Sequence, residues 1–159
     1  MSDYEPNPKV TAFFERLDRL DPGGRARLKR CAGKSLAESR DALGLFYSVL
    51  PFGVPSAQED IYFLAATLYP MAEGGGKGDL GAALHRARQD KNKKGLDRRV
   101  EILLDADETQ LPFRLRQAIQ FLHSNRVRVD WARLLDDVLF WNHPERRVQR
   151  RWARSYFAE

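Results

Sequence analysis

Arginines crowd the stretch PERRVQRRWAR, residues 144–154, at a spacing suited to contact with phosphate groups. In a helix at 100° per residue, Val148, Trp152 and Tyr156 share one sector of ~80° that would face a core. The arginines take the opposite ~140° with no acidic residue among them. A helix selected only for solubility would normally include glutamates, because like charges four residues apart repel. The arginines of this face are Arg146, Arg147, Arg150, Arg151 and Arg154.

Two interpretations of this helix remain open: contact with phosphate groups or another acidic partner, and a solvated face with no partner. One helical turn rises about 5.4 Å, roughly the repeat of successive phosphates along a nucleic-acid strand. Pro144 suits the first helical position, so we expect the helix to run from there to about Phe157. We expect charge reversal at Arg146, Arg150 and Arg154 to weaken nucleic-acid binding while the fold persists.

Further basic residues cluster earlier in the chain, in RARLKR (25–30), RARQDKNKK (86–94) and the pair 98–99. Arg126 and Arg128 precede an expected helix cap, and could clamp a nucleic-acid backbone or pair with Asp136 and Asp137. Such residues would position a phosphate backbone, with no device for reading bases. The predicted nucleic-acid interface consists of Arg146, Arg147, Arg150 and Arg154 in the last helix, together with Arg27, Lys29, Arg30, Arg98, Arg99, Arg116, Arg126 and Arg128.

The overall charge agrees with a nucleic-acid partner. The formal net charge is +5 and the isoelectric point about 9.6. Residues 1–60 carry as many acidic as basic side chains, so residues 61–159 hold the whole excess. Clustered positive charge is typical of nucleic-acid binding, although arginine-rich usage can also reflect genome composition.

Catalytic interpretations find little support. The three histidines are widely separated, and no nucleophile motif such as G-x-S-x-G occurs. The acidic run DADE (105–108) could hold divalent metal in a nuclease that uses Asp105, Asp107 and Glu108, but such residues between two helices ordinarily act as caps. GGGKGD (74–79) lacks the Lys-Ser/Thr pair and the preceding strand of a phosphate loop. We expect no catalytic residue, no metal and no cofactor.

Weak strand signals and frequent helix punctuation predict an all-α protein of about eight or nine helices, and its length fits one compact domain or two small bundles packed together. We expect residues 1–73 to form the first bundle, 74–78 a flexible glycine-rich linker, and 79–159 the second bundle. One helix is expected over 36–50, and another starts at a capping box of Ser56 and Glu59. The others are expected at about 8–20, 22–33, 79–87, 96–104, 110–123 and 130–141. Lys91, Lys93 and Lys94 would lie in a loop.

The compartment is expected to be the cytoplasm. The single cysteine, Cys31, allows no intramolecular disulfide. The first residues show no signal-peptide pattern, and no run approaches the roughly 18 apolar residues of a membrane span.

Several stretches occur in an order that resembles one family. They are FYSVLPFG (46–53), EDIYFLAATLYP (59–70), GDLGAALHRA (78–87), DRRVEILLDADETQLPFRLRQAI (97–119), VDWARLLDDVLFW (129–141) and VQRRWAR (148–154). Over most of residues 10–157 the chain resembles the CasB family, the small subunit of the type I-E CRISPR surveillance complex Cascade.

That resemblance implies a helical, structural subunit rather than an enzyme. Its implied partners are the guide RNA and the target DNA, the backbone and large subunits of Cascade, and a second copy of itself. Lys29 and Arg30, the Arg98–Arg99 pair, and Arg116 match basic positions of the family. Asp105 and Glu108 stand where some members have basic residues, which puts a nucleic-acid contact in that loop in doubt.

The sequence therefore predicts a subunit that binds nucleic-acid backbones without sequence preference and stabilises the open guide RNA–target DNA R-loop. The alternative is a helical adaptor whose basic face docks an acidic protein.

Overall fold

The computed structural model describes residues 4–158, and this part of the chain is all-α, as predicted. It holds nine α-helices and three short 3-10 helices, and its one β-type feature is an isolated bridge between Gly74 and Val129. The α-helices are α1 (Pro8–Asp18), α2 (Pro22–Arg30), α3 (Leu43–Val49), α4 (Glu59–Leu68), α5 (Leu80–Arg86), α6 (Lys93–Leu104), α7 (Leu111–Ser124), α8 (Trp131–Leu139) and α9 (Arg147–Phe157).

Side-chain caps start several of these helices where the sequence predicts. Asp21 accepts from the backbone N–H of Gly24 at 2.6 Å, Asp79 from Ala82 at 2.9 Å, and Asp130 from Arg133 at 3.2 Å. Each cap satisfies a backbone donor that the first turn of a helix leaves unpaired. The three predicted aspartate caps are confirmed.

The expected helix over 36–50 is wrong, because two shorter elements share this range. A 3-10 helix covers Leu36–Glu38, and α3 begins only at Leu43. Ser35 and Glu38 form a capping box that closes the short turn, and Ser39 then adopts extended backbone angles. The capping box expected at Ser56 and Glu59 is absent from the described residues, since α4 starts with Gln58 at its N-cap and no side-chain bond.

Two helix starts also differ from expectation. The last helix begins at Arg147 instead of Pro144, because Arg146 takes a left-handed conformation with φ of 52°. Its backbone N–H donates to the carbonyl of His143 at 2.9 Å, which closes a separate turn before α9. In contrast, α6 begins three residues earlier than expected, so Lys93 and Lys94 are helical.

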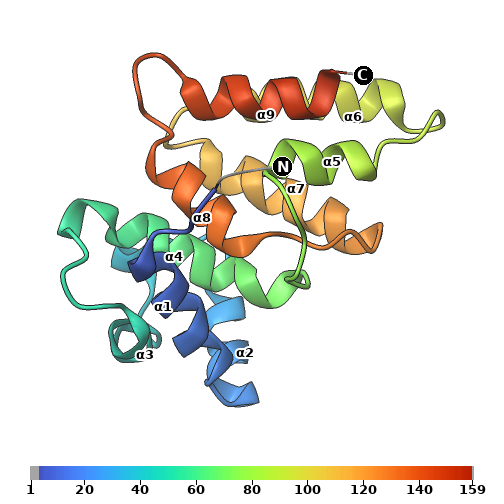
Figure 1. Ribbon diagram of the computed structural model, residues 1–159. Helices are drawn as coiled ribbons and strands as arrows, with labels where there is room; N and C mark the ends of the chain where they lie inside the picture. Colours follow the sequence, from blue (N-terminus) through green and yellow to red (C-terminus); the bar gives the residue numbers. More distant parts are fainter. Residues whose placement is uncertain (1–3, 159) are drawn as a thin grey trace.

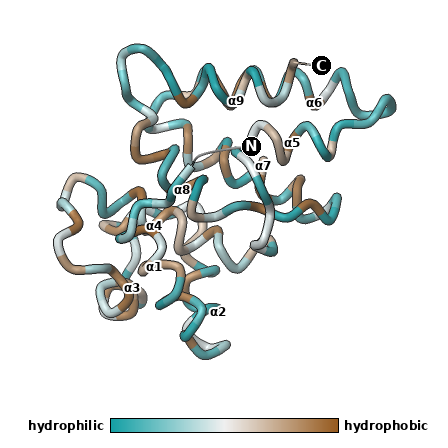
Figure 2. Tube along the Cα trace, in the orientation of Figure 1, coloured by the Kyte–Doolittle hydropathy of each residue, from teal (hydrophilic) through white to brown (hydrophobic). Residues whose placement is uncertain are grey.

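The helices share one continuous hydrophobic core. In Figure 1, α1 to α4 form the lower part of the molecule and α5, α6 and α9 the upper part, and α8 packs on both α1 and α4. Phe13 of α1 meets Phe46 and Tyr62 edge to face in the lower part. Along α9 the hydropathy alternates in Figure 2, as expected for a helix with one buried face.

The glycine-rich segment is anchored, although the sequence predicts a flexible linker there. Val129 donates its N–H to Glu73 at 2.9 Å, and Gly76 donates to Val129 at 3.3 Å. A Cβ on Gly76 would lie 2.4 Å from the carbonyl oxygen of Arg128, so only glycine allows this close approach. The division of the chain into two bundles stays a prediction.

Over residues 4–158, no helix combines the length and apolar character that crossing a membrane requires.

Candidate nucleic-acid interface

The outer face of α9 carries three exposed arginines, Arg147, Arg150 and Arg154. They are three and four residues apart, so they fall within about 60° of one another and span roughly 10 Å along the helix axis. We find no hydrogen bond or ion pair for any of the three within residues 4–158. No acidic residue occurs between Arg146 and Ala158. These guanidinium groups are free to bind an external anion.

The inner face of α9 is fixed in the core, which sets the direction of the arginines. Val148, Trp152 and Tyr156 are each at most 1% exposed, as the sequence predicts. The helix lies directly against α5, where a Cβ added to Gly81 would come within 2.2 Å of the carbonyl oxygen of Trp152. Ser155 also donates to Asp79, the cap of α5, at 2.9 Å. In Figure 1 the two helices run side by side at the top of the molecule.

A buried carboxylate on α8 ties the same helix to the centre of the protein. Asp137 is 4% exposed and accepts from the indole nitrogen of Trp152 at 2.8 Å and from the Nη2 of Arg151 at 3.0 Å. Burial raises the pKa of Asp137 above its ordinary value, although Trp152 and Arg151 act in the opposite direction. Arg151 therefore serves a structural ion pair.

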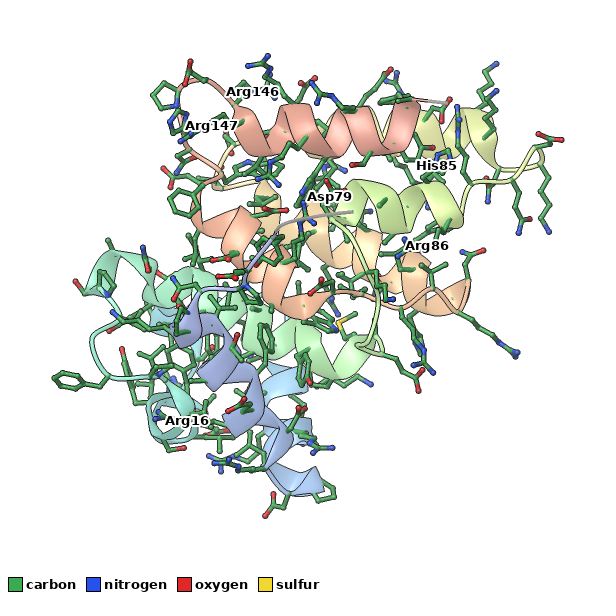
Figure 3. The ribbon with its side chains drawn as sticks, viewed as in Figure 1. Arg16, Asp79, His85, Arg86, Arg146 and Arg147 are labelled. Carbon is green, nitrogen blue, oxygen red and sulfur yellow. The ribbon has the colours of Figure 1, made fainter. Side chains whose placement is uncertain are left out.

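Arg146 is also engaged, so the predicted five-arginine face has three unengaged members. Its Nη2 donates to the carbonyl oxygen of Leu104 and lies 3.6 Å from a carboxylate oxygen of Asp105. Figure 3 shows Arg146 and Arg147 where α9 begins. Arg146 and Arg151 remain partly exposed, but each already binds a group within the protein. Binding an outside phosphate would compete with that contact, so the net gain in binding free energy would be smaller. The trio suited to charge reversal is Arg147, Arg150 and Arg154, and not the trio expected from the sequence.

Loss of the Asp137 carboxylate should destabilise the protein. Replacing Asp137 by alanine leaves the buried N–H of Trp152 without a partner, while the half-exposed Arg151 can turn to solvent. We expect a loss of about 2 kcal/mol in the free energy of unfolding. Urea denaturation followed by circular dichroism measures it.

Asparagine at the same position is the matched control, because its amide oxygen can still accept from Trp152. Since the folded pKa of Asp137 is raised, the folded protein binds a proton more tightly than the unfolded chain. Wild-type stability relative to the Asp137→Asn variant should therefore fall as pH rises through the window above the ordinary aspartate pKa. If the free energy of unfolding of the wild type instead rises with pH relative to that of the Asp137→Asn variant, the raised pKa of Asp137 is contradicted.

A second basic group lies on α6, which packs beside α9 (Figure 1). Arg98 is exposed and follows Lys94 by one helical turn, and Arg99 is exposed with its guanidinium 5.8 Å from the ring centre of Phe121. Arg88, from the basic run 86–94, instead binds both carboxylate oxygens of Asp97 at 3.0 Å. That pairing, with a hydrogen bond from Tyr156, lowers the pKa of Asp97.

The third group surrounds α2, in the lower part of the molecule and away from α9 (Figure 1). Arg27, Lys29 and Arg30 are exposed, and Arg27 donates to the carbonyl of Asp41. Arg19, from the end of α1, lines a surface hollow together with Arg27 and Arg30. Sequence analysis missed Arg19, because nothing in its local spacing marks it.

Arg116 and the pair before α8 occupy separate positions. Arg116 is half-buried on α7, where its Nη1 lies 3.4 Å from the Cβ position of Gly33, just after α2. Arg126 sits in a left-handed turn, and Arg128 lies 3.6 Å from the carboxylate of Glu73. Of the two alternatives for Arg126 and Arg128, pairing with Asp136 and Asp137 is not the one that the described residues show. Asp136 accepts from Tyr4 at 2.6 Å, and Asp137 faces α9.

The acidic run 105–108 does not converge on one point. Asp105 faces Arg146, Glu108 accepts from Asn142 at 2.9 Å, and Asp107 accepts from the backbone of Thr109 and Gln110 before α7. Those bonds, with one from the Thr109 hydroxyl, lower the pKa of Asp107. Within residues 4–158, no group of three metal-binding side chains comes together. The geometry gives no support to the nuclease interpretation.

The three tryptophans are not available for stacking on bases, because Trp131, Trp141 and Trp152 are each at most 4% exposed. The indoles of the first two donate to the carbonyls of Ala72 and Ala106. The structure therefore presents positive charge to a partner in three groups, on α9, α6 and α2. The arginines of α9 form the most regular row of the three.

Comparison with known proteins places this chain in a family. The model of the CRISPR-associated protein Cse2 family matches residues 24–157. A Cse2 protein of Thermus thermophilus is 40% identical over 102 residues, which span 63% of this chain and 57% of the relative. The crystal structure of a Cse2-family protein, also from Thermus thermophilus, is similar with a TM-score of 0.81 and 31% identity, covering 94% of this chain and 98% of that one.

A more distant likeness concerns a larger assembly. A chain in the crystal structure of Escherichia coli Cascade bound to a double-stranded DNA target matches with a TM-score of 0.68 and 21% identity. The match covers 96% of this chain and 97% of that one. At this identity the likeness concerns the fold alone.

Proposed function

The chain belongs to the CRISPR-associated Cse2 family, and we propose on this premise that it is a non-catalytic small subunit of a type I-E Cascade complex. In this role it binds nucleic-acid backbone without sequence preference and stabilises the R-loop between guide RNA and target DNA in antiviral defence. The observation that carries the proposal is the row of Arg147, Arg150 and Arg154 on α9, exposed and without partners within residues 4–158.

The mechanism follows from the balance of strand exchange. An RNA–DNA heteroduplex is about as stable as the DNA duplex that it replaces, so a few protein contacts to the backbone tip the equilibrium. Each phosphate bound by an arginine releases condensed counterions, which makes the gain largest at low salt. A fixed row of guanidinium groups supplies this gain without reading any base.

The partners in this proposal are the guide RNA, the target DNA, the backbone and large subunits, and a second copy of this chain. The fold that this chain shares with a chain of Escherichia coli Cascade supports the other Cascade subunits among these partners. The α6 group lies beside α9 and the α2 group lies apart from it, so one molecule can contact backbone at more than one place.

The test uses a reconstituted Cascade that lacks this subunit. Matched double-stranded target is titrated with and without the purified protein, and strand opening is followed by permanganate footprinting. We expect the protein to tighten target binding about ten-fold near 0.1 M salt, with a smaller gain at higher salt. Open target bases should persist longer when it is present.

Two other results would overturn the proposal in different ways. A protein that joins the complex but changes neither affinity nor strand opening is the helical adaptor, whose charge serves protein docking. In that case excess competitor nucleic acid should not displace it. A protein that never joins the complex is not a Cascade subunit.

A further inference from the structure

Gln149 is a buried polar residue of α9, and one atom of its amide group has no partner. The residue is 6% exposed, and its Nε2 donates to the carbonyl oxygen of Trp141 at 2.8 Å. Its Oε1 is buried and accepts no hydrogen bond within residues 4–158. A buried acceptor without a donor is rare and costs free energy, so it indicates a place where an outside donor would be favourable.

Gln149 lies in the wall of a hollow at the N-terminal end of α9. The hollow has a volume of about 400 Å³, and Asp105, His143 and Arg146 also line it. This volume falls within the range of roughly 300–1,000 Å³ that is usual for small-ligand sites. Figure 3 shows Arg146 where the chain enters α9. The hollow is therefore large enough for one small polar group of a ligand.

The hollow also has donors for an anion. The backbone N–H groups of Arg147, Val148 and Gln149 make no hydrogen bond within residues 4–158, and no side chain caps the helix there. These groups point back along the helix axis toward the hollow, at the positive end of the helix dipole. His143 accepts the N–H of Glu145 on Nδ1 at 3.1 Å. The proton of its neutral ring is therefore on Nε2, which is free to donate.

The charges around the hollow connect it to the arginine row of α9. The carboxylate of Asp105 lies 3.6 Å from Arg146, which offsets its charge, and Glu145 is exposed to solvent, which screens it. Arg150, a member of the exposed row, directly follows Gln149 and lies one helical turn beyond Arg146. A strand whose phosphates follow the row therefore passes this hollow.

Donors for an anion beside one unpaired acceptor favour a ribonucleotide. A phosphodiester accepts hydrogen bonds and has no proton to donate to Gln149. The 2′-hydroxyl of ribose is a donor next to the phosphate, and DNA lacks it.

We propose that the hollow binds one nucleotide of an RNA strand, with its phosphate at the N-terminal end of α9 and its 2′-hydroxyl donating to Oε1 of Gln149. This inference rests on the proposed function and deepens it, because it gives α9 a preference for the guide RNA over the target DNA.

The experiment compares three single strands of the same sequence and length, which are RNA, 2′-fluoro RNA and DNA. The 2′-fluoro group keeps the sugar conformation of RNA but cannot donate a hydrogen bond. Each strand is titrated with the full-length wild-type protein, and binding is followed by fluorescence anisotropy. We expect RNA to bind about five-fold more tightly than 2′-fluoro RNA, which corresponds to one hydrogen bond. DNA should bind no more tightly than 2′-fluoro RNA.

Two variants test whether Gln149 makes the contact. Gln149→Met keeps the length of the side chain and removes the acceptor, so it should bind RNA and 2′-fluoro RNA equally. Gln149→Glu is the matched control, because it loses the same bond to Trp141 but keeps an acceptor oxygen. Its negative charge should weaken both strands alike and leave the preference for RNA. Both strands are measured on the same variant, so a general loss of folded protein cancels in the ratio.

The outcomes separate this inference from the proposed function. Equal binding of RNA and 2′-fluoro RNA by the wild type would refute the inference and leave the proposed function standing. A preference for RNA that persists in Gln149→Met would place the hydroxyl contact elsewhere, so this site would be wrong. Displacement of the RNA by excess uridine 3′-monophosphate would make a free nucleotide, and not a strand, the ligand. Wild-type protein that binds none of the three strands would overturn both.

Discussion

The triple variant Arg147→Gln, Arg150→Gln, Arg154→Gln is expected to bind single-stranded DNA about 100-fold more weakly than wild type near 0.1 M salt. The three guanidinium groups lie in one row on α9, exposed and without partners within residues 4–158. If each binds one phosphate, their loss reduces the slope of log affinity against log salt by about 2, as expected for single strands. Fluorescence anisotropy over a range of salt concentrations measures both quantities.

A variant of equal charge distinguishes the row from the net charge. Lys34→Gln, Arg40→Gln and Lys77→Gln together remove the same three charges from exposed positions outside α9 and outside the other basic clusters. This control should keep nearly the wild-type salt slope. Equal losses in the two triple variants would show that net charge, and not the α9 face, attracts the nucleic acid. Both variants should retain wild-type circular dichroism, because exposed side chains contribute little to stability.

Gly81→Ala is expected to destabilise the protein by about 3 kcal/mol, the upper end of the usual cost of overpacking, because the contact is rigid. The added Cβ would lie 2.2 Å from the carbonyl oxygen of Trp152 and 2.8 Å from its Cα. These are backbone atoms, so a rotamer change cannot relieve the clash and α9 must move away from α5. Because α9 carries the arginine row, nucleic-acid binding should also weaken in any fraction that stays folded. Urea denaturation and DNA titration measure the two effects.

Gly95→Ala provides the matched control for that substitution. Gly95 is also helical, on α6, and nothing lies within 4 Å of its Cβ position. Alanine should therefore stabilise the protein by up to about 1 kcal/mol through its higher helix propensity. A Gly81→Ala variant as stable as wild type would show that α5 and α9 are not in the close contact that positions the arginines.

Local sequence determined much of the fold, because the signals concerned act over a few residues. Asp21, Asp79 and Asp130 cap helices through bonds to a backbone N–H three residues later. The buried stripe of Val148 and Trp152 follows from helical periodicity alone. Prediction failed where two local signals competed. Over residues 36–50 the Ser35–Glu38 capping box closed a short turn, and it interrupted a pattern that favours one continuous helix.

The candidate site required the tertiary structure, because the partners that decide it are distant in the sequence. Helical periodicity places five arginines on one face of α9, and it cannot distinguish among them. Arg146 is engaged by Leu104, 42 residues away, and Arg151 by Asp137, 14 residues away on α8. Packing of the Trp152 backbone of α9 against Gly81 of α5 then fixes where the remaining row points. The sequence by itself determined the helices and the surplus of positive charge, and only the packing of distant segments decided which arginines remain available to a phosphate.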